Sequence, residues 1–156
     1  MENKKKYITN GWLAVAIVTL ILAIDQIIKI EVKTNMTLGE AIRVTDWFYI
    51  EFIENNGMAY GMTFFNKLVL SLFRTFAIGA ISWYIWRGYV VCLAMILAGA
   101  AGNLIDCLFY GLVFDASTPF SVAGFVPFGT GYSTFLHGKV VDMFYFPIIR
   151  TTYPDG

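Results

Sequence analysis

The chain has few charged residues for its length. Only 14% of its 156 residues are Asp, Glu, Lys or Arg, whereas 58% are hydrophobic. A soluble domain is expected to be about a quarter charged and about half apolar. This shortage of charge excludes an ordinary soluble domain and indicates an integral membrane protein, of a length that suits one compact bundle. The formal net charge is zero, and we expect no nucleic-acid partner.

Cysteine and histidine are equally scarce. Cys92 and Cys107 are the only cysteines, and His137 is the only histidine. On one helix the two cysteines would lie roughly 22 Å apart at 1.5 Å per residue, which is beyond disulfide reach. They form neither a disulfide framework nor zinc-binding spacing. We therefore expect no disulfide, no metal and no cofactor.

The N-terminal region lacks a cleavage site. Lysines precede an apolar run, as in a signal peptide, but no small-residue cleavage motif follows. Instead the run from Trp12 to Ile24 continues into Asp25-Gln26-Ile27-Ile28-Lys29. This pattern predicts a first transmembrane helix over 11–30, with the lysines holding its N-terminus in the cytoplasm.

Two more apolar runs are present, from Leu68 to Trp86 and from Tyr89 to Leu108. Each is about long enough to cross a hydrocarbon core of ~30 Å. The sequence therefore predicts one membrane-embedded domain over 1–156. Its transmembrane helices are expected at about 11–30, 68–86 and 89–108, and its extracytoplasmic segments at 31–67 and 109–156.

In the first extracytoplasmic segment, the residues that would face one side of an extended chain show a weak alternating pattern. Phe48, Ile50 and Phe52 fall on one side of an extended chain, which predicts a short strand or two on the membrane surface. The Asn-Gly pair at Asn56 and Gly57 is typical of a turn. The stretch 109–139 is a long, weakly charged loop with no spanning helix.

Polar side chains interrupt the first and third helices at helical spacing. Asn103 and Asp106 share one helix face, and glycines nearby let another backbone approach closely. A carboxylate near the membrane core costs several kcal/mol, so Asp106 needs compensation. Asp25 and Lys29, four residues apart, are either an ion pair that snorkels at a helix end or part of a buried polar cluster.

The predicted topology brings all of these groups to one membrane face. A site made of Asp, Asn, Arg and Lys without a nucleophilic Ser or Cys is the economical explanation. Paired carboxylates in a partly dry site can share a proton, so that one acts as base on water and the other as acid towards a carbonyl oxygen. This chemistry fits hydrolysis of an amide at a membrane surface. The residues concerned are Asp25, Lys29, Asn56, Arg74, Asn103, Asp106 and Asp142.

Four short motifs follow one another along nearly the whole chain. They are Asp25-Gln26-x-x-Lys29, Asn56-Gly57-Met58-Ala59-Tyr60, Gly102-Asn103-x-x-Asp106 and Gly138-x-Val140-Val141-Asp142. Together they resemble the type II lipoprotein signal peptidases. The resemblance implies a four-helix membrane aspartyl protease with a small extracytoplasmic β-cradle, which cuts diacylglyceryl-modified prolipoproteins just before the lipidated cysteine.

The resemblance also implies a setting and a role for each residue. It implies a multi-pass protein of the bacterial inner membrane, with its site at the extracytoplasmic face and with prolipoproteins, membrane lipid and globomycin-like inhibitors as partners. Asp142 resembles one of the two catalytic aspartates. Asn56 and Asn103 resemble residues that line the substrate site, and Asp25, Lys29 and Asp106 resemble residues that hold its geometry. Gly57 belongs to the substrate-binding or supporting residues.

One departure from the family pattern concerns the second catalytic aspartate. In the family it belongs to an Asn-x-Ala-Asp motif that opens a fourth helix, and no such motif occurs before Gly156. We therefore expect three helices of a four-helix bundle, without the final helix, and a chain that is inactive by itself. The alternative is a non-catalytic remnant or a membrane protein that binds lipids or lipidated peptides. A small transporter would need polar groups near the bilayer midplane, whereas the polar groups here are predicted to lie at one membrane face.

Another departure is Cys107, where the family commonly has Arg. Arg74 is predicted to lie roughly 9 Å inside the outer end of the second helix. Its guanidinium could snorkel back to the headgroups. The other interpretation is that Arg74 faces inward and supplies the cation usually delivered from the position of Cys107.

Overall fold

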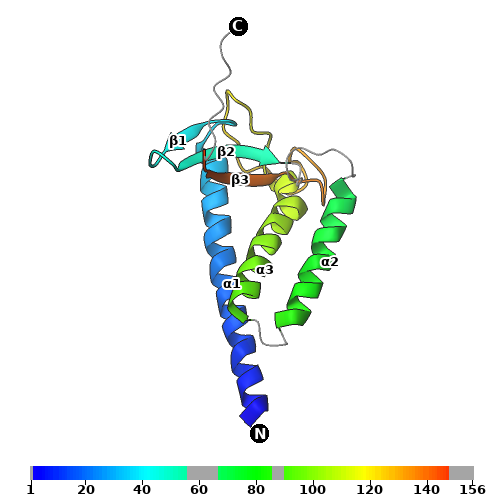
Figure 1. The fold of residues 1–156 in the computed structure, drawn as a ribbon. Coiled ribbons are helices and arrows are strands. Elements are labelled where there is room, and N and C mark those ends of the chain that lie inside the picture. The colour runs from blue at the N-terminus through cyan, green and yellow to red at the C-terminus, as the bar shows by residue number, and fades with distance from the viewer. Residues whose placement is uncertain (1, 56–66, 86–89, 148–156) are drawn as a thin grey trace.

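Three long helices stand side by side below a small sheet in this computed structural model, which describes residues 2–55, 67–85 and 90–147 (Figure 1). The helices are α1 (Glu2–Asn35), α2 (Lys67–Ile85) and α3 (Val90–Ile105). Helix α3 contacts both of the others. The sheet covers one end of this bundle, and α1 begins at the opposite end.

Helix α1 is longer than the predicted helix 11–30, and the prediction that 31–35 lies outside the helix was wrong. No glycine or proline occurs between Trp12 and Thr37 to end it earlier. In the last turn the Thr34 hydroxyl donates to the Ile30 carbonyl at 2.8 Å, and the side-chain amide of Asn35 donates to the Glu31 carbonyl at 2.9 Å. Gly39, which follows the helix, has a φ of +86°, a left-handed conformation that favours glycine.

Helix α3 also extends beyond its predicted end at 108. A π-helical turn, η2 (Asp106–Tyr110), and one α-helical turn, α4 (Gly111–Val113), continue it. The π turn lies where Gly138 packs on the helix backbone, with the Gly138 amide donating to the Cys107 carbonyl at 3.0 Å. Single π turns of this kind are frequent at functional sites. Helix α2 covers the predicted 68–86 except residue 86, which lies outside the described residues, and it begins one residue earlier than predicted.

The sheet has three antiparallel strands in the order β1-β2-β3, namely β1 (Ala41–Arg43), β2 (Tyr49–Asn55) and β3 (Val140–Tyr145). The expected strand around Phe48–Ile53 is confirmed as β2. Asp142 lies in β3, where it pairs with Ile53, and its neighbour Val141 pairs with Glu54. The pairing shifts between Ile50 and Ile53, so the predicted alternation does not continue along the whole strand.

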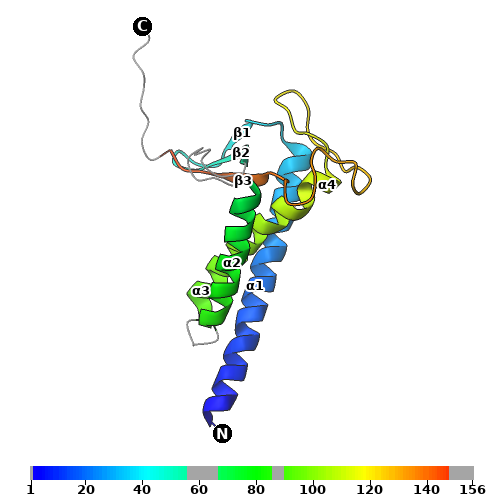
Figure 2. The ribbon, with the colours of Figure 1, turned by 90° about the vertical axis from the view of Figure 1, so that its right-hand side faces the viewer.

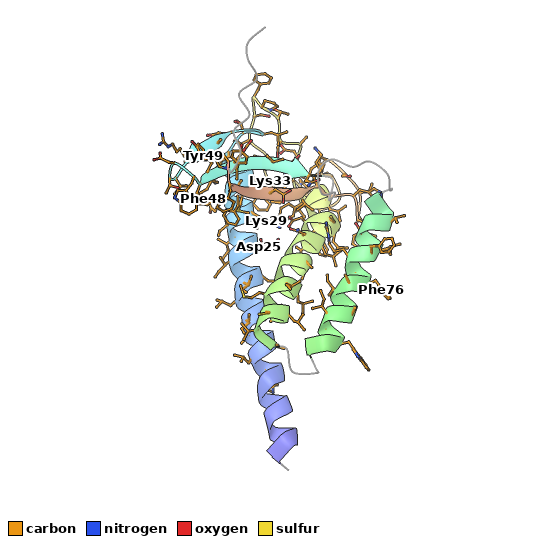
Figure 3. All side chains as sticks on the ribbon, viewed as in Figure 1. Asp25, Lys29, Lys33, Phe48, Tyr49 and Phe76 are labelled. Carbon is orange, nitrogen blue, oxygen red and sulfur yellow. The ribbon has the colours of Figure 1, made fainter. Side chains whose placement is uncertain are left out.

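The principal core lies between the sheet and the helix ends. It joins the last turns of α1 to η2, β2 and β3, and its buried members are Val32, Met36, Phe52, Tyr110, Phe114, Val141 and Met143. The helices below expose large apolar side chains instead, such as Trp12 and Phe76, and Figure 3 shows Phe76 pointing away from the bundle. Exposed apolar surface of this extent is typical of a membrane or protein contact.

Two stretches among the described residues are long and apolar enough to cross a membrane, Gly11–Asn35 and Val91–Val113. The small sheet and these helices fit a membrane protein. The third predicted crossing, by α2, stays a prediction.

Gly138 is a position that has no room for a side chain. A Cβ there would overlap the carbonyl oxygen of Asp106 and lie 2.9 Å from the amide nitrogen of Gly111, and both are rigid backbone atoms. We expect Gly138→Ala to destabilise the protein by about 1–3 kcal/mol, as overpacking usually does. The midpoint of thermal unfolding in detergent micelles measures this.

Gly99→Ala is the matched control, because a Cβ at Gly99 meets nothing within 4 Å. Alanine there should leave stability unchanged or raise it by about 0.5–1 kcal/mol through better helix propensity. Equal effects of the two substitutions would contradict the packing described for Gly138.

Candidate active site

Lys29 is the centre of a buried polar cluster between α1 and the end of α3. Its Nζ lies 2.7 Å from Asp106 Oδ2, 2.9 Å from Asn103 Oδ1 and 3.3 Å from Asp25 Oδ2. Lys29 is 2% exposed and Asp106 is fully buried. Figure 3 shows Asp25 and Lys29 on the part of α1 just below the sheet. Of the two alternatives for Asp25 and Lys29, the geometry is that of a buried cluster rather than a snorkelling pair.

Gln26 completes this cluster, and sequence reasoning gave it no role. Its Nε2 donates to Asp106 Oδ1 at 3.0 Å and to Asp25 Oδ2 at 3.1 Å. Its Oε1 accepts a hydrogen bond from the Tyr110 hydroxyl at 3.2 Å. Both oxygens of Asp106 are therefore hydrogen-bonded, as a buried carboxylate requires. The position of Gln26 inside the Asp25–Lys29 motif was the sequence feature that could have identified it as a site residue.

Asp106 also fixes the strand that carries Asp142. The Val141 amide donates to Asp106 Oδ2 at 3.2 Å, and β3 lies at the edge of the sheet. Val141 directly precedes Asp142 along the chain. The charge cluster of the helices is thus bonded to the backbone of the sheet, one residue from the candidate catalytic carboxylate.

Asp142 itself has an exposed side chain, whereas Val141 beside it is buried. Among the described residues, the Asp142 carboxylate has no hydrogen-bond or ion-pair partner. Asp106 differs in that its oxygens are engaged by Lys29, Gln26 and Val141. Of these two carboxylates, Asp142 is the one available to water or a substrate.

Arg74 of α2 faces α3. Its Nη1 lies 3.3 Å from the Asn103 carbonyl oxygen and 3.3 Å from Cys107 Sγ, and the side chain is partly buried. The guanidinium therefore does not adopt the snorkelling orientation considered from the sequence. Its partner Cys107 is a buried free thiol, and Cys92 is an exposed one.

A second charged network, missed by sequence reasoning, lies one helical turn above Lys29. Lys33 Nζ donates to Glu54 Oε1 at 2.5 Å and to Ser117 Oγ at 2.9 Å, and Lys139 Nζ donates to Glu54 Oε2 at 2.9 Å. The rings of Phe114 and Tyr132 lie 5.4 and 5.1 Å from Lys33 Nζ. Lys33 shares a helix face with Lys29, and this spacing would have identified it had α1 been extended to its observed end.

The two lysines hold the sheet from two directions. Lys29 holds Asp106, which accepts from the Val141 amide, and Lys33 holds Glu54, the cross-strand partner of Val141. Together they fix the height and register of β2 and β3 above the helices.

Two of the predicted site residues, Asn56 and Gly57, lie outside the described residues. Among the described residues, no group of three or more His, Cys, Asp or Glu side chains could hold a metal ion. The arrangement instead offers carboxylate acid–base chemistry at the junction of helices and sheet.

The family model described as "Signal peptidase (SPase) II" matches residues 17–155. A lipoprotein signal peptidase of Porphyromonas gingivalis is 43% identical over 155 residues, which cover 94% of this chain and 68% of that protein. The chain belongs to the signal peptidase II family. The resemblance inferred from the four motifs is therefore confirmed. Members of this family are membrane-bound aspartic proteases that process lipoprotein precursors.

Other relatives agree with this membership. A lipoprotein signal peptidase of Amoebophilus asiaticus is 33% identical and covers 92% of this chain, which spans 63% of that relative. Two solved structures, both titled as bacterial membrane enzymes, align with TM-scores of 0.64 and 0.62 over 91% of this chain, and over 74% and 79% of theirs. Their identities of 20% and 21% show a shared fold.

Glu54 generates a prediction about acid stability. Burial disfavours its charged form, but the hydrogen bonds and the positive charges of Lys33 and Lys139 together outweigh burial and lower the pKa of this carboxyl below its ordinary value of 4.5. A lowered pKa in the folded state means that Glu54 stabilises the fold fully above that ordinary value. This contribution is lost as the pH falls through the pKa of the folded state.

The measurement compares the thermal unfolding midpoint of the chain with that of Glu54→Gln from pH 7 down to pH 3. We expect the difference between them to be largest at pH 7 and to shrink in acid. A difference that grows in acid would contradict the sign of the shift.

Proposed function

We propose that this chain forms the helical bundle, the sheet and one catalytic aspartate of a peptidase that cuts diacylglyceryl-modified prolipoproteins just before the lipidated cysteine. The observation that carries the proposal is the hydrogen bond from the Val141 amide to Asp106. It ties the strand of Asp142 to the Lys29 cluster, so that an available carboxylate stands on a rigid support. Such support is what an acid–base site requires.

All three long helices cross the membrane in this proposal, and the site lies at the extracytoplasmic face. Helix α2 has 19 residues and is about 28 Å long, close to the hydrocarbon thickness. Its exposed side chains include Phe73 and Phe76. The lysines that precede α1's apolar run favour a cytoplasmic N-terminus, which puts the sheet on the outer side of a bacterial inner membrane.

The site residues divide by role. Asp142 acts on the scissile amide. Asp25, Lys29 and Asp106 hold the support below it, and Asn56, Gly57 and Asn103 line the path of the substrate. Globomycin-like inhibitors would occupy the same path. A prolipoprotein reaches this position naturally, because its lipid chains enter the bilayer beside the helices and leave the peptide at the surface.

The chemistry needs two carboxylates. One removes a proton from the attacking water while the other, protonated, donates to the carbonyl oxygen and then supports departure of the amine. Residues 1–156 supply Asp142 but not the Asn-x-Ala-Asp motif. We therefore propose that these residues alone do not cleave. The alternative is a non-catalytic protein that binds lipid or lipidated peptides.

The first experiment compares residues 1–156 with a fusion in which they are followed by the segment of the Porphyromonas gingivalis relative beyond its matched region, here called the fused chain. Both are reconstituted in lipid and given a diacylglyceryl-modified prolipoprotein. We expect cleavage only by the fused chain, and a loss of several orders of magnitude in its Asp142→Asn variant, because acid and base act as one unit. Asp46→Asn, in an exposed surface pair, is the control.

Three outcomes would contradict parts of this proposal. Cleavage by residues 1–156 that Asp142→Asn abolishes would overturn the need for a second aspartate. Full activity of the fused Asp142→Asn variant would overturn the role of Asp142. Binding of the lipidated precursor without cleavage by either chain would favour the alternative.

A further prediction concerns Arg74, which we propose supplies the cation that the family usually has at the position of Cys107. Its contacts with the Asn103 carbonyl and Cys107 Sγ place it beside that position. In the fused chain, Arg74→Leu should lower kcat/KM by about ten- to a hundredfold, the loss typical of a hydrogen bond to a charged group. Arg74→Lys should have a smaller effect, because lysine lacks the planar fork.

Cys107→Arg in the Arg74→Leu background provides the rescue test. Restored cleavage is the expected result. Unchanged cleavage and unchanged thermal stability in Arg74→Leu itself would show that this side chain has no part in the site.

A further inference from the structure

The segment 126–138 closes the outer end of α3 by hydrogen bonds from its backbone. A helix leaves its last carbonyl groups without partners inside the helix. Here amides of the segment satisfy them, as Val126 donates to Val113 at 2.9 Å, Gly129 to Leu112 at 3.0 Å, Tyr132 to Phe114 at 2.9 Å, Ser133 to Gly111 at 2.8 Å and Gly138 to Cys107 at 3.0 Å. The segment is therefore attached along the last two turns of the helical stretch.

Four of these five acceptors lie inside Val91–Val113, the stretch that is long and apolar enough to cross a membrane. Irregular backbone at that depth is tolerated only where its polar groups are paired with protein. The hydrogen bonds to 107–114 meet this condition for five amides of the segment. Figure 2 shows the connection that follows α4 gathered around the sheet end of the bundle.

The side chains of this segment suit the same depth. From Ala116 to Leu136 the sequence has no Asp, Glu, Lys or Arg. Phe128 is 72% and Phe135 is 53% exposed. Phe135 packs edge-on against Phe109 of η2, with ring centroids 6.4 Å apart, and Phe109 is itself exposed. Aromatic side chains at the end of a span are typical of the membrane interface.

Phe120, on the same connection, provides a contrast. It is 95% exposed, more than any other large apolar side chain in the described residues. Its neighbourhood is attached to the sheet side instead, because the Leu38 amide donates to the Thr118 carbonyl at 3.0 Å and Leu38 lies beyond the last turn of α1. Phe120 is therefore expected in water, above the membrane boundary.

We propose that segment 126–138 lies in the lipid interface of the outer leaflet, with Phe109, Phe128 and Phe135 in contact with lipid. The segment leads directly into β3, so its depth sets the height of Asp142 above the bilayer. This height of Asp142 matches the height at which a lipidated cysteine would lie. The inference rests on the proposed crossing of the membrane by Val91–Val113.

The test uses nitroxide labels on one introduced cysteine at a time in residues 1–156, reconstituted in liposomes. Four exposed positions are compared in a Cys92→Ser background, through Met95→Cys, Phe120→Cys, Phe128→Cys and Phe135→Cys. Cys107 is only 1% exposed. The Cys92→Ser chain without a further substitution measures any label that Cys107 takes up. Relaxation by oxygen, which concentrates in lipid, is compared with relaxation by a water-soluble nickel chelate.

We expect oxygen to dominate at 95, 128 and 135, and the nickel chelate to dominate at 120. Labels at 128 and 135 that are relaxed mainly by the nickel chelate, with 95 in lipid, would overturn the inference while leaving the proposed topology intact. A label at 95 in water would overturn the topology, and the inference with it.

Discussion

The fold depends on one buried ion pair, Lys29 with Asp106. A buried pair is stable only if its remaining hydrogen-bonding capacity is satisfied, and removal of one partner leaves an uncompensated charge. Here Gln26, Asn103 and the Val141 amide satisfy it. Because these partners come from α1, α3 and β3, satisfying the pair also fixes how the helices meet and where the sheet lies.

The ion pair between Lys33 and Glu54 is a second buried pair that joins helix and sheet, one helical turn above Lys29. Lys33 binds Glu54 of β2, and Lys139 closes the other side of the same carboxylate. Charge is therefore rare in the chain but concentrated where helices and sheet join. The exposed carboxylate of Asp142 stands on this junction, between a cluster that holds its strand and a surface that a substrate can reach.

The sequence predicted the parts of this arrangement that follow from local pattern. Hydropathy located the three helices, and helical spacing identified Asp25 with Lys29 and Asn103 with Asp106. It missed what depends on distant partners. The last turn of α1 and Lys33 are explained by Glu54 in the sheet, and β3 by its pairing with β2. The π turn at Asp106 accompanies contact with Gly138, which no local pattern in α3 reveals.

The most direct test of this account is hydrogen exchange at the Val141 amide, whose acceptor is Asp106 Oδ2. The chain in lipid nanodiscs is compared with Lys29→Met and with Arg43→Met, which removes only an exposed pair on β1. The account predicts that exchange at Val141 accelerates in Lys29→Met, relative to β3 amides paired with β2, and stays unchanged in Arg43→Met. Unaltered protection at Val141 in Lys29→Met would contradict the claim that the buried pair holds the strand of Asp142.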